Sequence, residues 1–234
     1  TLSTWARLLD WLSYRYQVLF VVSAGNAPAD LILETPRDTL ATQQPEQRQE
    51  LALQAFFGDA TSRRLISPAE SINAVTVGAA HVDAAPKTNV PRRYDLFPDH
   101  CVSPYSRIGH GFKRSVKPEI IMPGGRILHT ERIHSVAEVT EITSVDSVLG
   151  PGHKVATPPN SAGDNTRYTR GTSNATALAT RGAAQAYDVI DVLRAGDPIR
   201  LPEKYDAVLL KALLAHGADW GQIEELVCRA RRDI

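Results

Sequence analysis

The chain has 234 residues, of which 43% are hydrophobic and 22% charged, a composition typical of a globular protein with one sizeable core. Its 26 Lys and Arg residues balance its 26 Asp and Glu residues, so no net charge attracts nucleic acid, an anionic membrane surface or an acidic substrate. No apolar run is long enough to span a membrane, and we expect neither a nucleic-acid nor a membrane partner.

The first 26 residues predict a helix followed by a buried strand. Trp and Leu recur at helical spacing over residues 4–15, and residues 17–26, QVLFVVSAGN, form an apolar run that ends in small residues. A strand that is apolar on both faces is typical of a sheet covered on both sides, so we expect an α/β architecture with parallel strands. Ligands of such sheets bind outside the carboxyl ends of the strands, which makes the end of this run a candidate site.

Residues 27–104 predict an excursion, a strand and a loop. Segment 27–65 begins with a stretch rich in Pro, Asp and Thr and continues with an amphipathic helix pattern that starts near Pro45. We interpret this segment as an excursion from the core. Residues 71–80, SINAVTVGAA, predict a second strand. The polar, proline-containing stretch that follows, up to about residue 104, predicts a surface loop.

The remaining elements are a short strand, a β-rich segment and two helices. Residues 117–125, KPEIIMPGG, predict a strand bounded by prolines and glycines. Segment 126–167 has a β-rich centre over 135–149, and the Pro, Gly, Asn and Ser residues after it predict a loop. Ala- and Leu-rich patterns predict helices over 173–192 and 203–216. No internal repeat is visible, and one domain is the simplest organisation.

The two cysteines, Cys101 and Cys228, show neither zinc-ligand spacing nor the spacing of a disulfide framework. We therefore expect two free thiols. Free thiols favour a reducing compartment, which predicts a cytoplasmic location. The acidic residues have no EF-hand-like spacing, so no calcium or other metal site is predicted.

Motifs in a fixed order carry a family resemblance. They are VVSAGN at 21–26, SINAVTVGAA at 71–80, SPYSRIG with KPEIIMPGG at 103–125, and GTSNATALA at 171–179. Together they resemble the subtilisin-like serine proteases, the subtilases, over about the whole chain. The resemblance implies a three-layer α/β fold with a mostly parallel central sheet and helices on both faces. Segments 27–65 and 126–167 are then insertions.

The resemblance assigns catalysis to Ser173 and Asn26. Ser173 matches the nucleophile that forms an acyl-enzyme during peptide hydrolysis. Its place at a helix start supplies partial positive charge and unpaired N–H groups near the developing oxyanion. Asn26 matches the side chain that completes the oxyanion hole, because its amide donates a hydrogen bond without carrying charge. Taken alone, either residue fits a simpler role, as a helix cap or a turn residue.

The resemblance also implies a groove for a polypeptide substrate and no cofactor. Ser23, Ala24 and Gly25 match one wall of the pocket for the residue before the scissile bond, where small side chains leave room. Gly171 and Thr172 are expected to border the substrate beside the serine. Free backbone groups at such an edge can pair with an extended peptide.

The catalytic acid and base have no counterpart in the chain. Subtilisin places its triad in the order Asp, His, Ser, and nothing before Asn26 resembles the family's Asp strand or His-Gly-Thr helix. Seven histidines are present, in stretches that correspond to loops or helix ends away from the serine: His81, His100, His110, His129, His134, His153 and His216. We therefore expect residues 1–234 to be the C-terminal portion of a peptidase domain, inactive alone, whose upstream part supplies Asp and His.

Two other functions stay open. A pseudoprotease would keep the groove and the sheet as a binding module without turnover. A hydrolase of another kind could use the same serine, although Gly-Thr-Ser-Asn-Ala differs from the Gly-x-Ser-x-Gly elbow of esterases.

Overall fold

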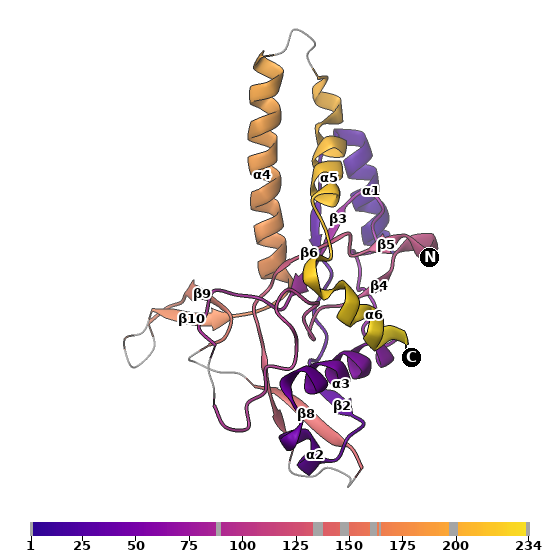
Figure 1. The fold of residues 1–234 in the computed structure, drawn as a ribbon. Helices are drawn as coiled ribbons and strands as arrows, with labels where there is room; N and C mark the ends of the chain where they lie inside the picture. Colours follow the sequence, from indigo (N-terminus) through magenta and orange to yellow (C-terminus); the bar gives the residue numbers. More distant parts are fainter. Residues whose placement is uncertain are drawn as a thin grey trace.

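A parallel three-stranded sheet forms the centre of the computed structural model (Figure 1). The structure describes residues 2–87, 90–132, 138–145, 150–159, 163, 165–196 and 201–232. Strands β1 (Val21–Ser23), β3 (Val75–Ala80) and β6 (Ile120–Pro123) pair in the order β1-β3-β6. The middle strand, β3, is buried at every position. Its residues are small or β-branched, as expected for a central strand of a parallel sheet. The predicted parallel sheet is confirmed.

The first strand is shorter than the predicted 17–26. Only Val21–Ser23 are strand, although Phe20 O still accepts from Val75 N and Ala24 N donates to Val77 O, both at 2.9 Å. The chain leaves the sheet after Ala24 because Gly25 adopts a positive φ of 94°. The end of the apolar run is therefore a turn at the carboxyl edge of the sheet.

Helix α4 (Thr172–Gly196) packs across all three strands of this sheet. Ala175 and Ala179 are fully buried, and their i, i+4 spacing places both on the helix face that meets the sheet. Helix α5 (Asp206–His216) lies beside α4 (Figure 1) and is preceded by a 3₁₀ turn, Glu203–Tyr205. Both predicted C-terminal helices are confirmed, with α4 extending past residue 192.

Helix α1 (Thr4–Tyr16) confirms the N-terminal helix prediction. Ser3 caps it by accepting from Ala6 N at 3.1 Å. Asp10 ties it to the segment before β3, because its carboxylate accepts from Ser71 Oγ at 2.7 Å and from Asn73 N at 2.8 Å. The helix is thus held through polar contacts as well as packing.

The two predicted insertions pair with each other. Strand β2 (Leu31–Leu33) comes from segment 27–65, and β7 (Leu128–Glu131) and β8 (Thr140–Val145) from segment 126–167. They form an antiparallel sheet in the order β2-β8-β7. Helices α2 (Arg37–Thr42) and α3 (Pro45–Gly58) complete this unit. The sequence indicated two separate excursions, whereas the structure joins them through β8.

A second hydrophobic core lies under the insertions, separate from the one between α4 and the parallel sheet. Leu33, Leu53 and Phe56 are fully buried, and Phe97 packs edge-on against Phe56. The C-terminal helix α6 (Glu224–Arg232) packs on α3 and contributes Val227. No sequence prediction covered α6.

The predicted loop after residue 149 was wrong in part. Strands β9 (His153–Ala156) and β10 (Thr166–Thr169) form an antiparallel hairpin that leads directly into α4. Two further short strands, β4 (Gly109–His110) and β5 (Val116–Lys117), flank a 3₁₀ turn, Phe112–Arg114. Residues 135–137 and 146–149 of the predicted β-rich centre lie outside the described residues.

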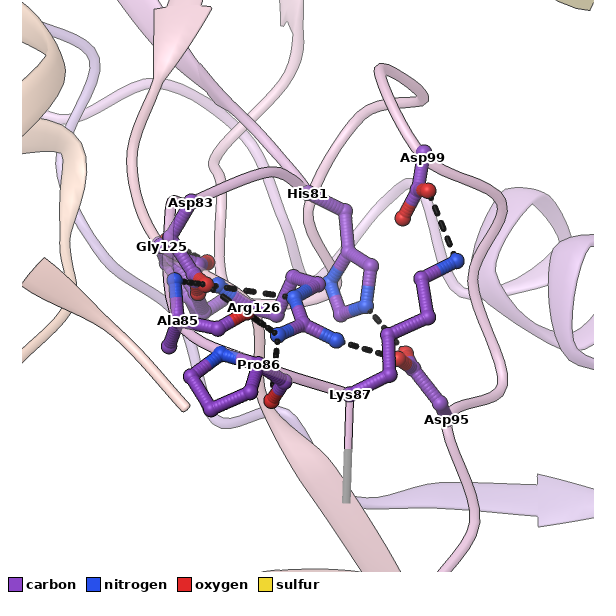
Figure 2. Close-up of polar contacts among 10 residues, drawn as sticks. His81, Asp83, Ala85, Pro86, Lys87, Asp95, Asp99, Gly125 and Arg126 are labelled. Atoms are coloured by element: carbon purple, nitrogen blue, oxygen red, sulfur yellow. Dashed lines mark hydrogen bonds and ion pairs between the residues drawn. The ribbon is translucent and has the colours of Figure 1, made fainter. Parts of the chain in front are cut away.

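The turn after β6 is anchored by the buried Arg126, as Figure 2 shows. Its backbone N donates to Asp83 at 2.6 Å, and its guanidinium contacts Asp83 at 3.2 Å and Asp95 at 3.1 Å. The same guanidinium donates to the carbonyl of Ala85 at 2.7 Å. Asp95 also contacts His81 Nε2 at 2.6 Å. These contacts fix the loop after β3 to the turn that supports the candidate site.

Removing the buried cation Arg126 should lower the unfolding free energy far more than removing the exposed cation Lys87; both are drawn in Figure 2. Arg126→Met leaves the fully buried Asp83 carboxylate unpaired, which is expected to cost about 3–5 kcal/mol of unfolding free energy. Lys87→Met breaks an exposed pair with Asp99 and should cost less than about 1 kcal/mol. Urea denaturation of both variants measures the difference, and equal losses would contradict this account of the network.

A buried histidine links the two predicted insertions. His129 on β7 is fully buried, and its Nε2 bonds to the carbonyl of Ala29, three residues after Asn26, at 3.1 Å. Burial lowers the pKa of His129 from 6.5 to about 4. The imidazole is therefore neutral at pH 7, with Nε2 as the donor.

This lowered pKa predicts acid sensitivity. Between pH 6.5 and pH 4 the unfolded chain binds a proton at His129 that the folded chain excludes. The unfolding free energy should fall by roughly 3 kcal/mol as pH drops through this window, at about 1.36 kcal/mol per pKa unit, with no contribution above it. Urea titrations at pH 7 and pH 4 measure the loss. His129→Gln keeps a donor for Ala29 and should reduce the loss; the same pH dependence in both proteins would refute the assignment to His129.

Candidate active site

Ser173 lies in the first turn of α4 with its side chain exposed to solvent. Gly171 N donates to Gly124 O at 2.9 Å, which ties the serine turn to the end of β6. Gly171 has a positive φ of 153°, and a Cβ there would lie 3.3 Å from Asn26 Nδ2. The backbone conformation therefore favours glycine, and a Cβ at this position would press against the Asn26 amide.

Asn26 lies against the same turn, 146 positions away in sequence. Its Oδ1 accepts from Thr172 N at 3.0 Å and from Thr172 Oγ1 at 3.1 Å. Two donors on one oxygen set the orientation of the amide, because only the carbonyl end can accept. None of the hydrogen bonds between described residues uses Asn26 Nδ2 as a donor, and the contact holds the Asn26 amide against Thr172, the residue before Ser173.

The backbone around Asn26 is held by segment 105–107. Ala27 N donates to Tyr105 O at 2.8 Å, and Arg107 N donates to Gly25 O at 3.1 Å. The Arg107 side chain adds a third contact, from Nε to the Asn26 carbonyl at 3.0 Å. We did not predict a role for Arg107, although it lies within the SPYSRIG motif.

The support under the serine turn includes a buried tyrosine. Tyr105 Oη donates to Gly125 O at 2.7 Å, and burial raises the pKa of Tyr105 to about 12. The phenol thus stays a neutral donor at physiological pH. Gly124 packs against Ala79 of β3 so closely that a Cβ would lie 2.4 Å from the Ala79 Cβ. The carboxyl ends of β3 and β6 therefore converge beneath Gly171.

The predicted pocket wall divides into a buried and an open part. Ser23 ends β1 and is partly buried, and Ala24 is fully buried. At Gly25, the side on which a Cβ would lie faces Ile66 and the aliphatic part of Arg107. Gly25 is the part of this wall that lies directly before Asn26, the residue that contacts Thr172.

No described histidine hydrogen-bonds to Ser173. His81 contacts Asp95, and His129 contacts Ala29 O. His153 lies nearer the serine turn than the sequence indicated, because β9 pairs with β10, but its Nε2 contacts Pro123 O at 3.3 Å. The remaining described histidines are His100, His110 and His216, and His134 lies outside the described residues.

The described part of the chain offers no cluster of three or more His, Cys, Asp or Glu side chains that could hold a metal. It also has no helix that is both long and apolar enough to cross a membrane. Cys101 is buried and Cys228 exposed, and both are free thiols. The turn itself presents the exposed Ser173 hydroxyl at the start of α4, with the Asn26 amide held against the residue before it. Such an arrangement suits stabilisation of an oxyanion formed by attack on a carbonyl.

Comparison with known proteins identifies the family of the chain. The model of the subtilase family matches residues 1–226. No curated protein and no solved structure gives a significant match. Because the family match covers nearly the whole chain, the protein belongs to the subtilase family of serine proteases.

Proposed function

We propose that residues 1–234 form the C-terminal portion of the catalytic domain of a subtilisin-like serine endopeptidase. The observation that supports this proposal is the contact between Asn26 and Thr172, the residue directly before Ser173. Family membership gives the reaction class, hydrolysis by a serine nucleophile. The roles of the individual residues are inferred from the contacts described above.

In the proposed reaction, Ser173 Oγ attacks the carbonyl carbon of the scissile peptide bond and its proton passes to a histidine base. The carbonyl oxygen becomes an oxyanion, which accepts from Asn26 Nδ2 and from the Ser173 backbone N–H. Collapse expels the amine, which takes the proton, and leaves an acyl-enzyme that water hydrolyses. Ser23, Ala24 and Gly25 border the residue before the scissile bond, and Gly171 and Thr172 border the peptide beside the serine.

The histidine and its aspartate are proposed to come from an upstream part of the same domain. Within the described residues β1 pairs only with β3, so its other edge is open to a further strand. Helix α1 exposes Trp5, Trp11 and Tyr14 at 65%, 54% and 76%. Large apolar side chains exposed together mark a surface that another element covers. An upstream segment with parallel strands and helices would cover both features and complete the three-layer fold.

A pseudoprotease is the alternative, favoured by the lack of a described histidine bonded to Ser173. Such a protein would bind an extended polypeptide in the same groove without cleaving it. The two functions differ in the segment that precedes residue 1: an Asp-bearing strand and a His-Gly-Thr helix favour the enzyme. The predicted cytoplasmic location stays a prediction.

The enzyme is tested by covalent labelling. The protein with its upstream part should react at Ser173 with a fluorophosphonate and hydrolyse peptides, because the base then activates the hydroxyl. Residues 1–234 alone should hydrolyse peptides negligibly. Mass spectrometry locates the label, and Ser173→Ala should abolish it. A folded, intact protein that binds peptide yet takes no label would instead establish the pseudoprotease.

The oxyanion donors predict graded losses of kcat. Asn26→Leu removes the side-chain donor, and in this family loss of that donor costs about 10²–10³ in rate. Thr172→Val removes one of the two bonds that orient the amide, which should lower kcat roughly five- to tenfold, the effect of about 1–1.5 kcal/mol. Thr176→Val is the matched control, because its hydroxyl bonds to the helix carbonyl of Thr172 rather than to Asn26. Peptide hydrolysis by the intact protein measures all three; equal losses at 172 and 176 would count against the orienting role.

A further inference from the structure

The side of Gly25 on which a Cβ would lie is covered by the side chains of Ile66 and Arg107. An ideal Cβ on Gly25 would lie 2.7 Å from Ile66 Cγ1, 2.8 Å from Ile66 Cδ1 and 3.1 Å from Arg107 Cδ. The Ile66 side chain therefore packs directly on the glycine that precedes the oxyanion asparagine. Ile66 is nevertheless 48% exposed, so one side of it meets Gly25 and the other remains open to an incoming group.

The segment that carries Ile66 is fixed in place. Arg107 Nη1 donates to Arg64 O at 2.7 Å, and Ile108 N donates to Arg63 O at 2.9 Å. The buried Arg63 side chain donates to Pro28 O at 2.9 Å and also contacts Pro104 O. After Ile66 the chain turns, with Ala69 N donating to Ile66 O at 2.9 Å. Because its backbone is held on both sides, Ile66 cannot withdraw far from Gly25.

We propose that Ile66 forms the floor of the pocket for the residue before the scissile bond and limits that pocket to small side chains. A substrate side chain that enters along Gly25 meets the Ile66 side chain where an open glycine wall would leave space. Alanine or glycine fits above this floor, whereas a large aromatic side chain must displace Ile66 or stay in solvent. This inference rests on the proposed peptidase function and names its substrate class, peptides cleaved after small residues.

The effect of Ile66 should appear as selectivity rather than as overall rate. A misfit of one methylene in an apolar pocket changes kcat/KM by about 10- to 200-fold. The intact protease should therefore cleave a peptide with Ala before the scissile bond at least about tenfold better than the same peptide with Phe. Ile66→Ala removes the floor and should reduce this Ala/Phe ratio by about tenfold or more, mainly because cleavage after Phe improves.

The matched control is Ile72→Ala. Ile72 is exposed to the same degree as Ile66, at 46%, but its neighbourhood includes Lys211 of α5 rather than Gly25. Its Ala/Phe ratio should equal that of the unmodified protein. Ile66→Val is a milder second variant that should shift the ratio in the same direction by a smaller factor. Fluorophosphonate labelling of each variant verifies that the active site is folded.

The outcomes separate this inference from the function on which it rests. A labelled Ile66→Ala enzyme with an unchanged ratio overturns the pocket floor while leaving the peptidase intact. So does an unmodified enzyme that prefers Phe. An intact protein that takes no label refutes the peptidase, and the pocket inference falls with it. A narrowed ratio in Ile66→Ala together with an unchanged ratio in Ile72→Ala supports the proposal.

Discussion

The site depends on two hydrogen bonds from Thr172 to the Asn26 carboxamide oxygen. They join the end of β1 to the start of α4, and so hold together two parts of the chain that no local interaction could bring together. They also fix the orientation of the amide, because two donors on its oxygen exclude the NH₂ group from the side that faces Thr172. A carboxamide that is oriented before substrate arrives need not reorganise when an oxyanion forms.

Around this contact, the structure uses main-chain carbonyls as anchoring points. Arg107 donates to the carbonyls of Asn26 and Arg64, and Arg63 donates to those of Pro28 and Asp30. A guanidinium group has five donors in a fixed plane, so one side chain can hold several segments at once. The loop after β1 is thereby fixed without a metal or a disulfide among the described residues. The same contacts bring the first insertion up to the predicted pocket wall.

The sequence predicted the elements whose signals are local. Helices α1, α4 and α5 follow from the spacing of their apolar residues, and the glycine at 171 and the asparagine at 26 follow from short motifs. The pairing of β2 with β8 could not be predicted, because it joins positions about 110 residues apart through hydrogen bonds between backbones that every sequence has. Hairpin β9–β10 was missed because Pro, Gly, Asn and Ser residues surround its short strands. The part played by Arg107 leaves no sequence signal either, since its acceptors are main-chain oxygens.

Strand β8 makes the two predicted insertions depend on each other. It pairs on one side with β2, from segment 27–65, and on the other with β7, which comes from the same segment as β8. Deleting residues 27–65 would leave the β2-facing edge of β8 unpaired, and deleting the second segment would do the same to β2. Segments 27–65 and 126–167 therefore stabilise each other, and a shortened chain that still folds would have to lose both together.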